Sequence, residues 1–428
     1  QAAPMRRVHV KGNMNLFDIG YASGGFLADS KVDGAVSFGP QQQWFTRNSE
    51  AGEWVGGNWN MMFVGVPGAP DENWPEMPYT TIEKTPLVRE KPYLTKEKGC
   101  FAVRVPDLKL NTEGPGWLNG TGTEKVLDIN KFYIANPETD NAETINSALK
   151  KGMNVLFTPG IYTISNPIKV TRKNTVVMGL GMPSLVPLNG NRVLEVSDVD
   201  GVTISGILLD AGVKRSEALL QVGEPGSAKN HSANPTFLSD VFVRVGGPHE
   251  GSVRSAVVIN SKNVVIDHIW LWRADHGNGV GWDMNRCANG LIVNGDNVTV
   301  YGLFNEHNQE YQTLWNGNGG KVYFYQSEMP YDPPSADAWT HDGVNGYASY
   351  KVADDVKTHE AWGLGIYNVF YQAPVIVDNA IETPENIEEY THHMIIFWLN
   401  GNEGSVVKSI INGKGGPVNK NVRKATLP

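Results

Sequence analysis

Four stretches of this sequence repeat one β-strand pattern, and that repeat limits the folds that the chain can adopt. Each begins with Asn or Gly, continues with alternating β-forming residues and closes on a polar or acidic end. The stretches are 201–210, 263–272, 297–306 and 320–328, and their shared valines are 62, 34 and 24 residues apart. One coil of a parallel β-helix takes roughly 20–30 residues, so the longer steps indicate inserted loops or a skipped coil.

The composition agrees with an all-β protein that has many tight turns. Charged residues make up only 19% of the chain, which also has 47 glycines and 12 tryptophans. Successive repeats would stack as parallel strands. A β-sandwich is the alternative, but hairpin turns at regular spacing are not evident.

The chain divides into two unequal parts. Residues 1–110 hold short β runs between Asp, Gly and Asn turns, followed by a proline-rich segment between Pro67 and Pro86. We expect them to form the C-terminal part of a β-helix that started before Gln1, with an open strand edge at its N-terminal end. Residues 111–130 are rich in Gly, Thr and Asn and predict a linker, and 131–428 predict a second, complete β-helix.

One helix is expected, over residues 140–151. An Asp or Asn cap precedes apolar residues at 145, 148 and 149, and lysines occupy the last turn beside Gly152.

Charge and cysteine content limit the partners. The net charge of −9 argues against nucleic acid and against anionic membranes, since both usually bind a basic patch. The chain begins with Gln1 and has glycosylation sequons at Asn119, Asn230 and Asn297, which favours a processed, secreted protein. Cys100 and Cys287 can form one disulfide or remain separate thiols.

Residues 270–282 concentrate groups that a buried core would not choose, namely three tryptophans, Arg273, Asp275, His276 and three glycines. An acid beside aromatic rings is a common way to hold a sugar, so Asp275 is a candidate catalytic acid and His276 a candidate orienting residue. A turn aspartate that caps backbone N–H groups is the alternative for Asp275.

Glu306 and Glu328 end equivalent runs of two successive repeats. On neighbouring coils they would lie about 5 Å apart, near the separation found in retaining glycosidases. Asp275 and Glu328, two coils apart, would be separated by nearer to about 10 Å, which suits inversion by an intervening water. A polar ladder on a solvated face is the alternative for both glutamates.

His359 and Glu360 precede Trp362 and show the same acid-plus-aromatic character, so we include them among the candidate catalytic residues. Several aromatic side chains and one arginine are candidate substrate-binding residues, because tryptophan outside a core offers an apolar face with a polar handle. These residues are Trp272, Arg273, Trp282, Trp315, Trp362 and Tyr331. No metal site and no cofactor are predicted.

The segment 140–164 resembles the capping helix and first coil of pectate-lyase-like right-handed β-helices. A β-helix tail followed by a complete β-helix is similar to the two-helix β-1,3-glucanases. Residues 24–412 also resemble secreted microbial proteins labelled coagulation factor 5/8 type domain-containing, through 41–48, 89–94, 272–277, 329–334 and 350–354. These resemblances imply an all-β, right-handed parallel β-helix fold and a carbohydrate substrate.

We therefore expect a secreted glycoside hydrolase that acts on a β-glucan-like polysaccharide, with Glu328 as the acid and Asp275 or Glu306 as its partner. A polysaccharide lyase with Arg273 or Lys351 as its base is the first alternative, and a non-catalytic carbohydrate-binding or structural protein is the second. The open strand edge would pair with another chain or with an N-terminal fragment of the same precursor.

Overall fold

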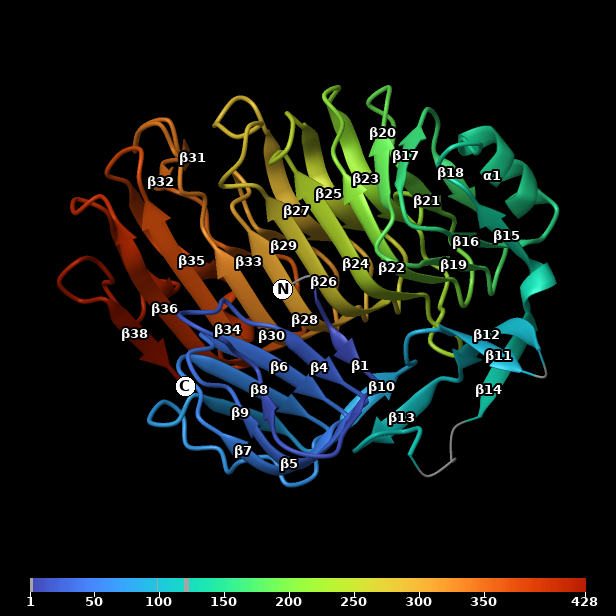
Figure 1. Cartoon of the computed structure of the whole chain (residues 1–428). Helices are drawn as coiled ribbons and strands as arrows, with labels where there is room; N and C mark the ends of the chain where they lie inside the picture. Colours follow the sequence, from blue (N-terminus) through green and yellow to red (C-terminus); the bar gives the residue numbers. More distant parts are fainter. Residues whose placement is uncertain (1–2, 98, 119–122) are drawn as a thin grey trace.

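The structure, a computed structural model, describes residues 3–97, 99–118 and 123–428, and most of its elements are strands (Figure 1). The sequon at Asn119 and the middle of the predicted linker lie outside the described residues. The strands form two parallel stacks, which we call the first β-helix (residues 3–82) and the second β-helix (residues 132–428). The prediction of a parallel β-helix fold with a partial helix before a longer one is confirmed.

The first β-helix has two parallel sheets. One contains, in spatial order, β1 (Met5–Arg6), β4 (Phe26–Ala28), β6 (Gln43–Arg47), β8 (Asn60–Val64) and β9 (Tyr79–Ile82). The other places β5 (Lys31–Ser37) beside β2 (His9–Val10), β3 (Met14–Asn15) and β7 (Glu50–Val55). Between these sheets lies a core that includes Leu27, Phe38, Trp44 and Phe63. Within residues 3–15 the chain forms only short strands, and β1 is an edge strand.

An antiparallel junction connects the two β-helices. It consists of the pair β10 (Thr85–Val88) and β13 (Lys109–Thr112), and of the three strands β11 (Tyr93–Glu97), β12 (Cys100–Pro106) and β14 (Glu124–Asp128). The predicted linker over 111–130 therefore carries strand structure near both of its ends. The Gly-, Thr- and Asn-rich composition does not predict these strands, because Lys125–Leu127 becomes a strand by pairing with β12, which lies some twenty residues earlier.

The second β-helix is built on one long sheet, which carries the candidate residues described below. Its strands, in spatial order, are β15 (Phe132–Ala135), β16 (Asn154–Phe157), β19 (Val176–Gly179), β22 (Thr203–Asp210), β24 (Phe237–Val245), β26 (Val265–Arg273), β28 (Thr299–Glu306), β30 (Gly320–Glu328), β34 (His359–Phe370), β36 (Thr391–Gly401) and β38 (Lys424–Leu427). All of these pair in parallel except the last, β38, which is antiparallel to β36. The short strands β17 (Ile161–Ile164) and β20 (Ser184–Pro187) join the same sheet.

A second parallel sheet closes the coils. It contains β18 (Ile168–Val170), β21 (Leu194–Val196), β23 (Ser216–Val222), β25 (Val253–Ile259), β27 (Cys287–Val293), β29 (Thr313–Trp315), β33 (Tyr350–Val352), β35 (Ile376–Glu382) and β37 (Val406–Ile411). A hairpin of β31 (Thr340–His341) and β32 (Val344–Asn345) projects from one coil. The space between the sheets is filled by a continuous apolar core.

Helical structure is confined to three short segments of the described chain, η1 (Ile129–Lys131), α1 (Ala142–Lys150) and α2 (Glu385–Glu388). The predicted helix is confirmed as α1. Asn141 caps it by accepting a hydrogen bond from the backbone N–H of Thr144, and Ile145 and Leu149 are buried. It stands at the end of the second β-helix where the coils begin (Figure 1).

The four repeats identified in the sequence are β22, β26, β28 and β30. The step of 62 residues contains a skipped coil, since β24 pairs with both β22 and β26. The step of 34 residues is a single coil with a loop inserted after β26, because β26 and β28 pair directly.

The Asn or Gly in the turn before several strands of the long sheet has a conformational cause. Asn174, Gly201, Asn263, Asn297 and Gly319 all have φ between 55° and 71°. Asn and Gly tolerate this left-handed region best. The backbone N–H groups of Asn174, Asn263, Asn297 and Gly319 each donate to a carbonyl of the next coil, as when Asn263 N–H donates to the carbonyl of Asp296. The ladder of turns thus keeps the strands in register.

The two β-helices pack side by side, with the first lying against the long sheet of the second (Figure 1). Phenylalanines from both sides meet there, as in the contact of Phe45 with Phe324 at 5.8 Å between ring centres. Among the described residues no helix is both long and apolar enough to cross a bilayer.

A buried ionic network also joins the two β-helices. Arg6 lies 2.7 Å from both Asp240 and Asp267, and Arg47 lies 2.9 Å from Asp267 and 2.6 Å from Glu90. The side chains of Arg47 and Asp267 are completely buried. The charges of the first β-helix are therefore neutralised by those of the second and of the junction.

The two cysteines are separate thiols. Cys100 is exposed in the junction, and Cys287 is buried in the second β-helix. Burial raises the pKa of the Cys287 thiol to about 12, so this side chain remains a neutral core residue.

Candidate active site

Glu306 and Glu328 are the last residues of β28 and β30, and they lie directly opposite each other in the register of the two strands. Because side chains alternate between the faces of a strand, both carboxyl groups project from the same outer face of the long sheet. Neighbouring strands are about 4.8 Å apart. Trp272 on β26 and Tyr367 on β34 continue the same row on either side of the pair.

Glu328 is set up to hold a proton at neutral pH. Burial, together with the carboxylates of Glu306 and Asp275, raises its pKa to about 8, against the opposing effect of a hydrogen bond from Tyr331. The hydroxyl of Tyr331 donates to Oε2 of Glu328. The Glu328 side chain is 12% exposed, so part of it remains open to solvent.

Glu306 is held by an indole. Trp270 Nε1–H donates to Glu306 Oε2 at 2.7 Å, and the Glu306 side chain is almost fully buried. The ring of Trp270 in turn stacks on that of Trp272, with 5.3 Å between centres. This contact fixes Glu306 through an uncharged donor.

Asp275 and His276 follow β26 and close the cluster on that side. His276 Nδ1 lies 2.9 Å from Asp275 Oδ1, and the His276 ring packs on Trp272. His307 is shared between the acids, since its Nε2 lies 3.9 Å from Asp275 Oδ1 and 4.0 Å from Glu328 Oε2. Asp275, Glu306 and Glu328 are therefore brought together, with His276 at the exposed rim.

Three aromatic residues beside this cluster were not predicted from the sequence, namely Trp59, Tyr367 and Phe397. Trp59, in the loop before β8 of the first β-helix, stacks on Phe397 at 4.3 Å and contacts Tyr367 at 5.3 Å. Phe397 is opposite Tyr367 in the register of β34 and β36. Trp59 lies more than 200 residues from the repeats that carry the acids, so no local pattern connects it with them.

His359 and Glu360 do not join the cluster, contrary to the expectation from their composition. They begin β34, opposite Gly320 and Lys321, whereas Glu328 lies opposite Tyr367 at the other end of the pairing. His359 is buried and bonds the hydroxyl of Tyr350 at 2.7 Å, and burial lowers its pKa to about 3. Glu360 forms an ion pair with Lys321.

Arg273 makes structural contacts, whereas the sequence predicted that it would bind substrate. Its guanidinium is 1% exposed and binds Asp332 through both carboxylate oxygens, at 2.7 and 2.8 Å. It also donates to the carbonyls of Asn285 and His307. Arg273 thus ties the loop after β26 to the loop after β30, both of which border the carboxylates.

Three of the tryptophans predicted to bind substrate also make structural contacts. Trp315 is fully buried in the core of the second β-helix. Trp362 stacks between Tyr323 and His392 in the contact between the two β-helices. Trp282 packs against the core and over Arg273, with 5.6 Å from its ring centre to the guanidinium carbon. Among the predicted aromatic residues, Trp272 and Tyr331 lie at the carboxylates.

The residues proposed as the base of a lyase are engaged elsewhere. Arg273 is enclosed by its ion pair, and Lys351 lies on β33 in the other sheet, 3.2 Å from Glu382. The described residues contain no group of three or more His, Cys, Asp or Glu side chains suited to a metal ion.

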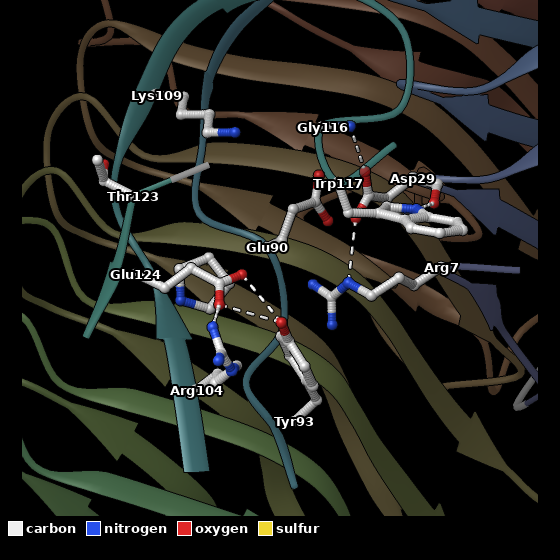
Figure 2. Close-up of a pocket in the computed structure, with 11 residues that line it drawn as sticks. Arg7, Asp29, Glu90, Tyr93, Arg104, Lys109, Gly116, Trp117, Thr123 and Glu124 are labelled. Atoms are coloured by element: carbon white, nitrogen blue, oxygen red, sulfur yellow. Dashed lines mark hydrogen bonds and ion pairs between the residues drawn. The ribbon is translucent and has the colours of Figure 1, made fainter. Parts of the chain in front are cut away.

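A separate polar cavity of about 260 Å³ lies where the first β-helix meets the antiparallel junction (Figure 2). Its carboxylates are matched by donors. Glu124 accepts from Tyr93 and Arg104, and Asp29 accepts from the Gly116 N–H at 2.7 Å. Burial and the neighbouring Glu90 raise the pKa of Asp29 to about 7.

Comparison with known proteins connects this geometry with a family. Residues 132–328 match the family model described as the LAM55 pectate lyase-like domain. Over 420 residues, 97% of this chain and 69% of the relative, the sequence is 47% identical to an exo-beta-1,3-glucanase of Streptomyces sp. (strain SirexAA-E / ActE).

Solved structures extend the comparison to three dimensions. The structure of sacteLam55A from Streptomyces sp. SirexAA-E superposes with a TM-score of 0.96 at 44% identity, and the match covers 100% of this chain and 78% of that one. A variant of the same Streptomyces protein, solved in complex with glucose, superposes equally well. The chain therefore belongs to the family of exo-β-1,3-glucanases that carry the LAM55 pectate-lyase-like domain, and it is a glycoside hydrolase.

Proposed function

We propose that this protein is an exo-acting hydrolase of β-1,3-glucan that releases glucose from chain ends. The observation that carries the proposal is the pair of Glu306 and Glu328, in register on adjacent strands, with one member protonated at neutral pH. The name of the Streptomyces relative supports the linkage and the exo mode, and the glucose complex of its variant supports the product.

Glu328 acts as the general acid. A carboxyl group with a pKa of about 8 carries its proton at pH 7 and can pass it to the glycosidic oxygen as the bond to the anomeric carbon breaks. Tyr331 orients the carboxyl through the oxygen that it bonds.

Glu306 supplies the second carboxylate, and Trp270 holds it in place. It either attacks the anomeric carbon or takes a proton from an attacking water. The first anomer released distinguishes the two routes: retention assigns Glu306 as nucleophile, and inversion assigns Glu306 or Asp275 as the base that activates water.

Trp272 and His276 form the sugar-binding rim of this site. Trp272 is only partly buried and directly precedes Glu306 in the row across the sheet. An indole face beside the reacting bond suits the apolar face of a glucosyl ring.

The proposal is tested by incubating the purified protein with linear β-1,3-glucan, β-1,4-glucan and starch. Glucose as the first product from the β-1,3-glucan alone is expected. Release of longer oligosaccharides first would contradict exo action, and equal rates on the β-1,4-glucan would contradict the linkage.

An extracellular location belongs to the same proposal. Polymeric β-glucans are too large to enter a cell intact, so the enzyme has to meet them outside. Detection of the protein in the culture medium of its native host, and its absence from washed cells, would support this.

A further inference from the structure

Polar atoms of two buried side chains lack a partner next to the proposed acid. Within the described part of the chain, neither the hydroxyl of Tyr367 nor the amide oxygen and nitrogen of Gln326 makes a hydrogen bond, and both side chains are 0% exposed. Buried polar groups are nearly always hydrogen-bonded, and an exception calls for an explanation, which includes a catalytic role.

The backbone register places both side chains beside Glu328. Tyr367 lies opposite Glu328 on the adjacent strand, and Gln326 lies two residues before Glu328 on the same face. Gln326 is itself opposite Gly365. A Cβ atom at Gly365 would collide with the Tyr367 hydroxyl, so the phenol lies back over this glycine, toward Gln326.

The proposed reaction creates a need for a donor at this point. When Glu328 gives its proton to the leaving oxygen it becomes a carboxylate, beside the carboxylates of Glu306 and Asp275. Among the described residues, Tyr331 donates a hydrogen bond to it, and His307 Nε2 lies 4.0 Å away. A carboxylate has about four acceptor positions, so it can take further donors. Hydrogen bonds at catalytic groups often tighten only when the substrate is bound.

We propose that Tyr367 is a positioning residue that donates a hydrogen bond to the carboxylate of Glu328 after the proton has left, and that Gln326 orients its hydroxyl. Tyr367 keeps its own proton throughout: the proton moves from Glu328 to the glycosidic oxygen, and the carbon–oxygen bond to the leaving sugar breaks. Burial and the nearby Glu328 raise the pKa of Tyr367, so the phenol stays neutral and able to donate. The role rests on the proposed function of Glu328.

The decisive variant is Tyr367→Phe, which removes one hydroxyl and keeps the ring. Loss of a donor to the carboxylate form raises the pKa of Glu328, so the alkaline limb of the kcat profile should move to higher pH. At the optimum, kcat on linear β-1,3-glucan should fall roughly 10- to 100-fold, the value of a hydrogen bond to a charged group, with little change in KM. Gln326→Leu should shift the limb in the same direction by less.

Tyr323→Phe is the matched control. Tyr323 lies on the same strand, β30, and stacks on Trp362, away from Glu306 and Glu328, so its variant should retain the wild-type alkaline limb. A merely structural role of Tyr367 would lower the midpoint of thermal unfolding without moving the limb.

Carbon-13 NMR measures the pKa of Glu328 without turnover. The titrating carboxyl signal that is absent from the Glu328→Gln spectrum belongs to Glu328. A higher pKa in Tyr367→Phe than in the wild type supports the proposal, and an unchanged pKa overturns it. If the wild-type protein does not hydrolyse β-1,3-glucan, the proposed function itself fails. If it does, and both the limb and the pKa are unchanged, only the role of Tyr367 fails.

Discussion

Two pairs of carboxylates lie near the contact between the β-helices, and the pairs differ in the side chains that surround them. Burial and the neighbouring Glu90 raise the pKa of Asp29 to about 7, and burial with the neighbouring carboxylates of Glu306 and Asp275 raises that of Glu328 to about 8. At Asp29 the backbone N–H of Gly116 and the guanidiniums of Arg7 and Arg47 act against this rise. At Glu328 the opposing contact is the neutral hydroxyl of Tyr331.

A raised pKa alone therefore does not mark a catalytic acid. The partner of Asp29, Glu90, accepts two hydrogen bonds from Arg47 at 2.6 and 2.8 Å, so that pair is tied into the ionic contact between the β-helices. Glu328 and Glu306 are held by Tyr331 and Trp270, whose uncharged donors orient a carboxyl group without fixing its charge. A proton can therefore leave the second pair with less disturbance of the fold.

The largest expected effect separates the pairs by activity. Glu328→Gln should lower kcat on linear β-1,3-glucan by at least about 1000-fold, because the amide cannot deliver a proton. Glu90→Gln, the equivalent change in the other pair, should keep kcat within a few-fold of the wild type. Initial rates of glucose release measure both, and similar losses in the two variants would remove the distinction.

The second effect separates the pairs by stability. Arg47→Met leaves Asp267 and Glu90 without a partner that both of them share, and breaking a buried ion pair costs about 3–5 kcal/mol. Chemical denaturation should show this loss, while the properly folded variant retains its turnover at 25 °C. An unchanged unfolding midpoint would mean that the network does not hold the β-helices together.

A third effect concerns the pH dependence of activity. Because Glu328 must be protonated, kcat/KM should be maintained below its pKa of about 8 and fall as the pH rises through that value. Rates measured between pH 5 and pH 10 test this. An alkaline limb centred below about pH 6.5 would assign the acid to another group.

The smallest effect concerns the pH dependence of stability at Asp29. Its folded pKa of about 7 lies above the unfolded value of about 3.9, so the protonated form stabilises the fold at low pH, and this contribution is lost as the pH rises through 7. Asp29→Asn keeps an acceptor for the Gly116 N–H and should flatten the curve, gaining about 1–2 kcal/mol at pH 8 relative to the wild type. Thermal unfolding at pH 5 and pH 8 compares the two, and identical pH slopes would exclude this role.

The sequence predicted the β-helix and the carboxylate pair for the same reason. A repeat aligns equivalent positions, so the sequence alone places Glu306 and Glu328 side by side, as the strand register has them. Asp275 follows the preceding repeat directly and lies with them.

The candidates chosen by composition alone fared differently. His359 and Glu360 combine an acid with a nearby aromatic residue, Trp362. They lie at the start of β34, whereas Glu328 lies at the end of β30, and only the strand register reveals this separation. Trp315 has the same residue type as Trp272 and lies inside the coil. The aromatic residue that the first β-helix contributes, Trp59, lies far from the acids in sequence and meets their sheet only through the packing of the two β-helices.

The ladder of left-handed Asn and Gly turns has a consequence for how this enzyme tolerates change in length. Extra residues in the loops between coils leave the strands aligned, as the long loop after β26 already does. One residue added within β30 would instead reverse the faces of the strand, so that Glu328 pointed into the apolar interior and Ser327 outward. Insertions and deletions should therefore be accepted freely in the loops and rejected within the strands, and chimeras between relatives should be joined at the turns.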